Sequence, residues 1–130
     1  MSIATNRKAR HEYHILDKYE AGIALKGSEV KSIREGNVSI KESYVRFFTS
    51  ELFIIGMHIA EYENIGYDNV QSVRDRKLLL HKRELVKLKS KVDEKGVTMI
   101  PLNLYLKKNL VKLEFGLAKG KKLWDKRKDK

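Results

Sequence analysis

Every second residue is apolar in two neighbouring runs of the chain, 100–106 and 111–117. A period of two places one set of side chains on one face of a β-strand, so each run predicts a strand whose apolar set faces the core. The polar residues 107–109 between the runs predict a turn, which makes the pair an antiparallel hairpin. Pro101 lacks the amide donor of a strand ladder, and we therefore expect it at an edge or a bulge.

Further strand patterns occur in the first half of the chain. Residues 44–49 and 52–59 are rich in aromatic and β-branched side chains and are separated by the polar pair Ser50-Glu51. This pattern predicts a second hairpin. Shorter apolar alternation over 12–16 and 19–25 predicts two more strands. Together these segments indicate a fold built mainly from β-strands.

Helical periodicity occurs in two stretches. The first runs from Ser28, whose hydroxyl suits an N-cap, to Gly36, which suits the left-handed position that ends a helix. The second covers residues 82–95, gathers apolar side chains on one face and ends at Gly96. The sequence therefore predicts one short helix and one longer helix between the strands.

Short strands with interposed helices predict a mainly β fold with α, a small closed antiparallel barrel with two or three packed helices. The Greek-key, oligonucleotide-binding (OB) barrel suits a basic protein, although periodicity alone does not choose it over another small α+β barrel. The 130 residues contain no internal repeat and no Gly/Ser-rich or Pro-rich linker, and the residues after 118 are mostly charged. We therefore expect a single domain over 1–118 and a basic segment over 119–130 that is flexible when free.

Charge indicates the class of partner. The chain has 28 Lys and Arg against 17 Asp and Glu, a net charge of +11, which favours nucleic acid first and anionic lipid second. Lysines that serve only solubility or heat adaptation are the alternative, but heat adaptation raises both signs together. There is no cysteine, and the longest uncharged runs, 52–60 and 96–106, are too short to span a bilayer. These features predict a cytoplasmic protein without membrane association.

No motif predicts catalysis or a bound metal. His11 and His14 are three residues apart, whereas a helical zinc site needs a spacing of four. Residues 116–122 resemble a phosphate loop but have too few residues between the glycines and no hydroxyl residue after the lysine. Glu61 and Glu63 could share a strand face and ligate magnesium, so a metal-dependent nuclease is the enzymatic alternative. Because no tight acidic cluster supports it, we expect a non-enzyme without metal or cofactor.

Three segments combine basic and aromatic residues: 6–13 (NRKARHEY), 76–85 (RKLLLHKREL) and 116–127 (GLAKGKKLWDKR). Three shorter motifs lie at 19–22, 27–32 and 37–44. Taken in their order along the sequence, these segments and motifs cover nearly the whole chain, and together they resemble the small protein B family. The resemblance implies an OB-type fold, no catalysis and binding to the tRNA-like domain of transfer-messenger RNA (tmRNA) near its elbow. It also implies delivery of alanyl-tmRNA, with elongation factor Tu and GTP, to a stalled 70S ribosome, so that trans-translation can begin.

The resemblance also assigns individual residues. Those that match the tmRNA-contacting face of the family are Asn6, Arg7, Lys8, Arg10, Glu20, Leu79, His81 and Lys112. Those that match the segment facing the ribosomal decoding centre, and hence small-subunit rRNA, are Lys119, Gly120, Lys121, Lys122, Trp124, Lys126 and Arg127. The family continues into a longer basic tail that is nearly absent here. We therefore expect residues 1–130 to bind tmRNA almost normally, while tagging should fail or be weak. We also expect the protein to be a monomer.

Physical chemistry is compatible with these roles but leaves alternatives open. Lys112 alternates with apolar neighbours in its strand, so it faces solvent and can reach a phosphate. Glu20 either accepts hydrogen bonds from RNA or forms a structural salt bridge. Leu79 belongs to three consecutive leucines that cannot all face inward, and Trp124 either stacks on a base or packs in the core. A basic barrel that binds RNA without selecting tmRNA is the remaining alternative from the same class.

Overall fold

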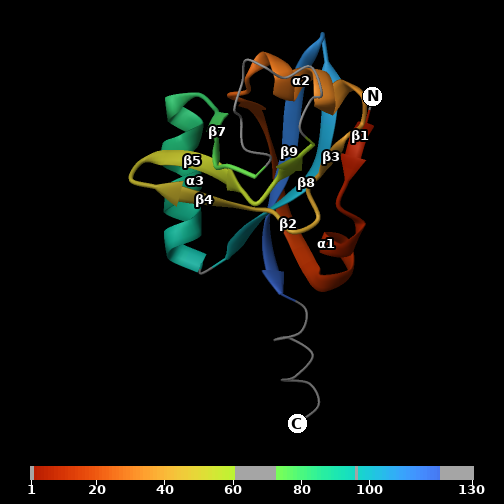
Figure 1. Cartoon of the computed structure of the whole chain (residues 1–130). Helices are drawn as coiled ribbons and strands as arrows, with labels where there is room; N and C mark the ends of the chain where they lie inside the picture. Colours follow the sequence, from red (N-terminus) through yellow and green to blue (C-terminus); the bar gives the residue numbers. More distant parts are fainter. Residues whose placement is uncertain (1, 61–72, 96, 121–130) are drawn as a thin grey trace.

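The computed structural model describes residues 2–60, 73–95 and 97–120. The described strands are β1 (Ser2–Thr5), β2 (Tyr13–Ile23), β3 (Val38–Ser39), β4 (Tyr44–Phe48), β5 (Glu51–Ile55), β6 (His58–Ile59), β7 (Arg76–Leu79), β8 (Thr98–Lys107) and β9 (Leu110–Gly120). The described helices are α1 (Arg7–Glu12), α2 (Gly27–Arg34) and α3 (Lys82–Lys95). The strands form the centre of the molecule and the helices lie around them (Figure 1), so the prediction of a mainly β fold with helices is confirmed.

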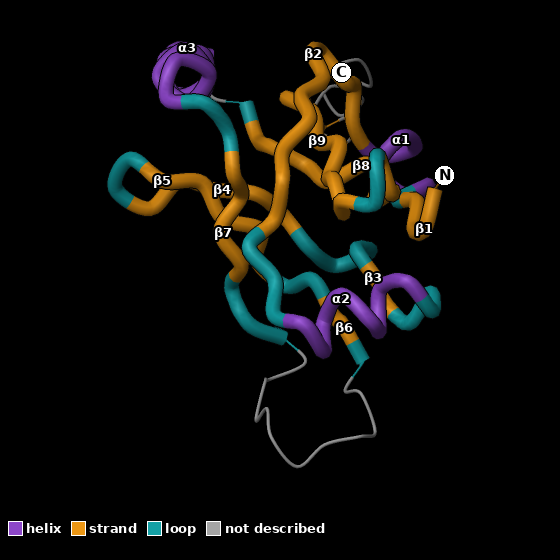
Figure 2. The backbone as a smooth tube through the Cα atoms, turned by 90° about the horizontal axis from the view of Figure 1, so that it is seen from above, coloured by secondary structure: helices purple, strands orange, loops and turns teal. Residues whose placement is uncertain are grey.

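The main sheet closes on itself. Seven strands pair in the order β1-β8-β4-β5-β7-β2-β9, and β8 also pairs with β9. This additional pairing joins the last strand of the order, β9, to the second, β8, so the strands from β8 to β9 form a ring, with β1 attached to the outer edge of β8. All of these pairings are antiparallel. Seen from above, the three helices lie outside the ring at separate places (Figure 2).

The β8–β9 hairpin confirms the strongest strand prediction. Its turn consists of Lys108 and Asn109, which have positive φ angles of 52° and 66°. Two-residue hairpin turns of type I′ require positive φ at both central residues, and their twist matches that of the flanking strands. The register between the two strands shifts between Pro101 and Asn103, which places Pro101 at a bulge, as its missing amide donor predicts.

The bulge divides the apolar residues of β8 between two clusters. The alternating pattern predicts that Ile100 and Leu102 face the same core as Leu104, and this prediction is wrong. Met99 and Leu104 lie in the main core, whereas Ile100 and Leu102 lie in a second cluster beneath α1. One extra residue in the strand reverses the faces on its two sides.

The earlier strand predictions need two corrections. β4 pairs with β5 from Tyr44↔Ile55 to Phe48↔Glu51, but the second strand does not continue to residue 59. Gly56 has a φ of 84°, which turns the chain away, and β6 pairs instead with β3 in a separate two-stranded sheet. The two strands predicted over 12–16 and 19–25 are one strand, β2, whose pairing with β9 is irregular between Ile15 and Asp17.

The helices follow the sequence in part. α3 has the predicted bounds and buries Leu88 completely. Ser28 is not the N-cap of α2, because the helix begins one residue earlier and Lys26 occupies the cap position. At this cap the carboxylate of Glu29 accepts a hydrogen bond from the backbone amide of Lys26 at 2.9 Å. No pattern predicts α1, since its six residues are too few to show a helical period.

A buried ion cluster connects α2 to β7. Glu29 and Arg76 have only 3% and 0% of their surface exposed, and Arg76 Nη2 lies 2.7 Å from Glu29 Oε2. Arg74 pairs with the other oxygen of Glu29 at 2.7 Å, and Arg76 also donates to the Met57 carbonyl at 2.8 Å. These charges need such a full set of partners, because leaving a buried charge without its partner lowers the stability of a fold by several kcal/mol, on the order of 3 to 5.

Candidate nucleic-acid interface

One row of residues crosses four strands on the outward face of the ring. Gly22 of β2 pairs with Leu79 of β7 on one side and with Lys112 of β9 on the other. Lys112 pairs in turn with Tyr105 of β8. Residues directly opposite each other in antiparallel strands point to the same face. Leu79, Gly22, Lys112 and Tyr105 therefore form one continuous surface, called the outer row below.

Leu79 is the outward member of the leucine triplet. It is 50% exposed, whereas Leu78 is 1% exposed and lies in the core. The neighbouring residue in the row, Gly22, has no side chain to cover it: a Cβ atom at Gly22 would lie in contact with Leu79, 3.5 Å from its Cβ. The structure thus leaves a flat apolar surface over β2 and β7, of a kind on which an unstacked base can pack.

Glu20 lies two residues before Gly22 on the same face and carries the negative charge of this surface. The Tyr105 hydroxyl donates a hydrogen bond to Glu20 Oε2, and Lys107 Nζ lies 3.4 Å from Oε1. The bond from Tyr105, with the charges of Lys107 and Lys112, holds the pKa of Glu20 below its ordinary value. Glu20 is therefore ionised at neutral pH, and its remaining lone pairs are open to a further donor.

Lys112 and His81 lie at different places around this surface. Lys112 is half-buried between its strand neighbours, and its face in β9 is the predicted one. His81 is exposed and lies two residues beyond Leu79. Its carbonyl oxygen accepts a hydrogen bond from the backbone amide of Leu85, in the first turn of α3, at 3.1 Å. The structure thus brings Glu20, Leu79 and Lys112 to the outward face of the ring, with the exposed His81 two residues beyond Leu79.

The N-terminal basic segment lies elsewhere. Asn6 is only 3% exposed: its side chain accepts a bond from the Ala9 amide at 3.3 Å and donates to the Pro101 carbonyl at 3.0 Å. It thus caps α1 and fixes the helix to β8. The other predicted members, Arg7, Lys8 and Arg10, are exposed on α1, so Asn6 positions the charged surface from inside.

Two ends of the molecule therefore carry the predicted residues. Helix α1 leads into Tyr13, the first residue of β2, and nine residues separate Tyr13 from Gly22 in the outer row. At about 3.3 Å per residue the two ends are roughly 30 Å apart. Helix α1 thus ends at the Tyr13 end of β2, away from Gly22, while β1, which leads into α1, pairs through Ser2 with Tyr105 of the outer row.

The beginning of the predicted decoding-centre segment lies beside α1. Lys119 and Gly120 end β9 and pair with His14 and Tyr13, so the strand continues two residues beyond the expected domain boundary at 118. Lys119 is exposed. The other predicted members of this segment, Lys121, Lys122, Trp124, Lys126 and Arg127, lie outside the described residues, as do Glu61 and Glu63.

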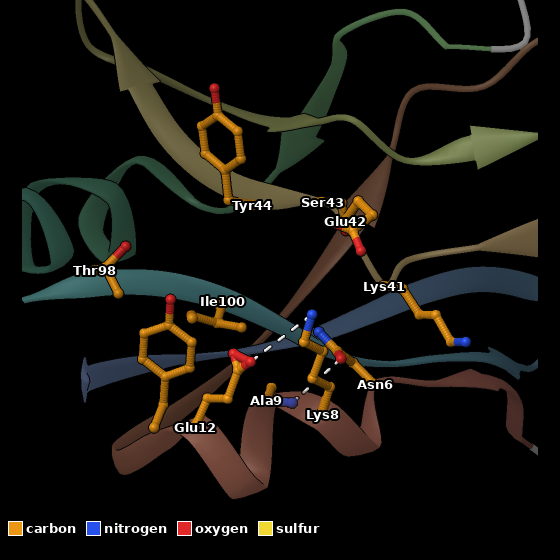
Figure 3. A pocket seen from close by; sticks show the side chains of 11 residues that line it. Asn6, Lys8, Ala9, Glu12, Lys41, Glu42, Ser43, Tyr44, Thr98 and Ile100 are labelled. Atoms are coloured by element: carbon orange, nitrogen blue, oxygen red, sulfur yellow. Dashed lines mark hydrogen bonds and ion pairs between the residues drawn. The ribbon is translucent and has the colours of Figure 1, made fainter. Parts of the chain in front are cut away.

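A polar cleft of about 400 Å³ separates α1 from the start of β4 (Figure 3). On one side Lys8 and Glu12 form an ion pair of 3.8 Å along the helix. Lys41 and Tyr44 line the other side, and Ile100 of β8 lies between the two. The sequence does not indicate this cleft, because its residues come from separate segments that only the fold brings together. Charges of both signs and hydroxyl groups suit it to hydrogen-bonding ligands.

Sequence reasoning also missed the partners of Glu20. Tyr105 and Lys107 belong to the hairpin that the pattern predicts, and alternation places Tyr105 opposite the apolar set, yet nothing local shows that β2 and β8 flank β9. The described ranges contain no group of three or more His, Asp or Glu arranged to hold a metal. They also contain no helix long and apolar enough to cross a membrane.

Comparison with known proteins extends this description. The family model described as "SmpB protein" matches residues 3–130. The SsrA-binding protein of Carboxydothermus hydrogenoformans is 57% identical over 127 residues, which cover 98% of this chain and 85% of the relative. That of Acetivibrio thermocellus is 54% identical, with 98% and 82% covered. A solved structure described as "tmRNA-SmpB: a journey to the center of the bacterial ribosome" contains a chain 52% identical, with a TM-score of 0.73 and coverage of 90% and 82%. The chain belongs to the SmpB family.

Proposed function

We propose that this protein binds the tRNA-like domain of tmRNA through the outer row and Glu20. The observation that carries the proposal is the assembly of one outward surface from segments distant in sequence: Glu20 and Gly22 on β2, Leu79 on β7 and Lys112 on β9. Relatives that are more than half identical are SsrA-binding proteins, and the similar solved chain comes from a tmRNA-SmpB complex in the ribosome.

The chemistry of this surface suits a folded RNA. Lys112 supplies a cation for a phosphate, and such contacts give affinity without sequence information. Glu20 is held ionised by Tyr105 and Lys107, so it repels phosphates, and within an RNA it can accept hydrogen bonds from donors on bases or ribose. A base displaced from its stack, as in the loops of a tRNA elbow, can pack on Leu79. Attraction and selection are thus supplied by different residues.

The opposite end suits the ribosome. Arg7, Lys8 and Arg10 on α1 lie near Lys119, and this end leads into the segment 121–127. We assign Lys119 and the segment 120–127 to small-subunit rRNA at the decoding centre, and the outer row together with Arg7, Lys8 and Arg10 to tmRNA, so that one molecule joins the two in trans-translation. Elongation factor Tu with GTP acts through alanyl-tmRNA and needs no surface on this chain. The protein works as a cytoplasmic monomer and catalyses no step.

The test compares RNA molecules at fixed salt, because affinity alone follows from the net charge. The chain is expected to bind the tRNA-like domain of tmRNA more tightly than a random RNA of equal length. Lys112→Ala should weaken this binding and reduce the slope of log K against log salt by roughly 0.7 to 0.9, the value for one phosphate contact. Glu20→Ala should reduce the preference for the tRNA-like domain more than it reduces binding to random RNA.

Two results would contradict the proposal. Equal affinity of the unmodified chain for the two RNA molecules would remove tmRNA as the specific partner. Degradation of either RNA that depends on magnesium would point instead to a nuclease. A matched control is Lys87→Ala, which removes an exposed lysine of α3 that belongs to neither β2 nor the outer row and should leave the preference unchanged.

A further inference from the structure

The hairpin β4–β5 carries a second outward surface whose chemistry differs from that of the outer row. Arg46 pairs with Phe53, which pairs with Lys77 of β7, and Phe48 lies two residues from Arg46 on the same face. We call Arg46, Phe48, Phe53 and Lys77 the hairpin platform. Both backbone views show the tip of this hairpin projecting away from the rest of the ring (Figures 1 and 2).

The platform is aromatic and cationic at once. The Arg46 guanidinium lies 5.1 Å from the centre of the Phe48 ring, and the Phe48 and Phe53 rings meet edge to face with centres 5.5 Å apart. Phe48 is nevertheless 41% exposed. The acid of this face, Glu51, pairs with Lys77 at 2.5 Å. The surface therefore offers ring faces and positive charge with little net repulsion for an anion.

Alternation along the strands explains why these side chains face outward. The residues between them, Val45 on β4 and Leu52 and Ile54 on β5, are almost completely buried in the main core. A strand cannot turn Phe48 inward without turning Val45 outward, since their faces are fixed by the period of two. The core thus enforces the exposure of an aromatic group whose transfer from water would otherwise be favourable.

We infer that the hairpin platform binds unpaired RNA bases by stacking. Every base has a π-face, so aromatic side chains bind single strands with little sequence preference. Arg46 adds a second planar group, which stacks on bases and attracts phosphates. The inference rests on the proposed function in that the RNA supplying these bases is the one held by the outer row.

Continuity with the outer row favours RNA over a protein partner. Lys77 of the platform and Leu79 of the outer row are two residues apart on β7 and share its outward face. A strand leaving the outer row therefore meets Lys77 first and the phenylalanine rings next. The net charge of +11 favours a polyanion over the acidic or apolar surface of a protein, because every phosphate contact releases counterions.

The experiment uses the full chain and two probes, the folded tRNA-like domain and an unstructured oligouridylate of about 12 nucleotides, a length within the usual site sizes for single strands. Phe48→Leu should weaken oligouridylate binding about five- to hundredfold while leaving the salt slope unchanged, since stacking is lost and no charge is removed. Phe48→Tyr should bind like the unmodified chain. Val86→Ser, at a residue of α3 that is 63% exposed, is the control and should have no effect.

The two proposals fail separately. If Phe48→Leu binds oligouridylate as well as the unmodified chain does, the platform is not a stacking site, whatever Lys112→Ala does to the tRNA-like domain. If Lys112→Ala leaves the folded probe unaffected while Phe48→Leu weakens the unpaired one, the outer row is wrong and the platform stands. A loss with Phe48→Tyr as large as with Phe48→Leu would also overturn stacking. Thermal melting confirms that each variant is folded, as expected for exposed positions.

Discussion

Glu29 is a carboxylate that the fold buries almost completely, with 3% of its surface exposed. Burial raises its pKa, but hydrogen bonds from Arg74, the Lys26 amide and Arg76 outweigh burial, and the pKa of Glu29 is lowered below 4.5. Burial also lowers the pKa of Arg76, although Glu29 opposes this effect. The two charges stay paired at neutral pH because their mutual attraction and hydrogen bonds replace the hydration that each loses on burial.

This pair predicts a dependence of stability on pH. A carboxylate whose pKa is lower in the folded than in the unfolded state stabilises the fold fully above the unfolded value, about 4.5, and this contribution is lost as pH falls through the folded value. Glu29→Gln should lower the free energy of unfolding at pH 7 by roughly 3 to 5 kcal/mol, since it leaves Arg76 buried without its counter-charge. Urea unfolding at pH 7 and at about pH 3.5 should show a smaller difference at the acidic pH.

Glu51→Gln is the matched control, because the Glu51–Lys77 pair is about half exposed on both sides. Exposed pairs contribute on the order of 0 to 1 kcal/mol. Equal destabilisation by the two substitutions would show that burial of Glu29 does not set its contribution.

At the scale of elements, two glycines of the described segments have a left-handed backbone conformation but differ in their structural role. Gly36 and Gly56 have the same φ, 84°, yet their surroundings differ. An added Cβ atom would meet nothing within 4 Å at Gly36, whereas at Gly56 it would lie 2.9 Å from the Glu42 carbonyl oxygen. Gly36 only allows α2 to end, while Gly56 also lets the backbone before β4 pass close to the end of β5.

Comparing the substitutions Gly36→Ala and Gly56→Ala distinguishes the cost of backbone strain from the cost of a steric clash. Gly36→Ala should cost roughly 1 to 2 kcal/mol, the strain of a side chain in the left-handed region. Gly56→Ala should cost at least about 1 kcal/mol more, because backbone atoms must also shift. Chemical denaturation of the two variants measures the difference directly. An equal cost would mean that the segment at Glu42 yields to the added methyl group.

Over the whole molecule, β9 links the two proposed interfaces. Lys112 lies in the outer row and Lys119 near the other end of the same strand, seven residues away, or about 23 Å at 3.3 Å per residue. The β2 and β8 ladders flank β9 along this length, so the strand fixes the separation between the proposed tmRNA contact and the proposed ribosome contact.

Two lysines of one strand should therefore have separable effects. Lys112→Ala should weaken binding to the tRNA-like domain and reduce tagging in proportion. Lys119→Ala should retain that binding within about twofold yet reduce tagging on stalled ribosomes, since it acts only after tmRNA is bound. Binding is measured by titration and tagging in a reconstituted rescue assay. A parallel loss of binding in both variants would show that tmRNA contacts the whole length of β9.

The sequence by itself determined the features that depend on local order along the chain. The period of two predicts the β8–β9 hairpin and the outward face of Lys112, the missing amide of Pro101 predicts its bulge, and the spacing of motifs indicates the family. These follow from chain geometry that every strand or helix shares.

Only the tertiary structure decided which strands are neighbours. Residues far apart in sequence meet in the outer row because β2 pairs with β7 and β9. The cleft beside α1 is likewise lined by residues of α1, of the segment before β4 and of β8. Pairing partners depend on the burial of the whole core, to which every strand contributes, and no short segment contains that information. The short helix α1 depends in the same way on Asn6 reaching the carbonyl of Pro101, a contact across 95 residues of sequence.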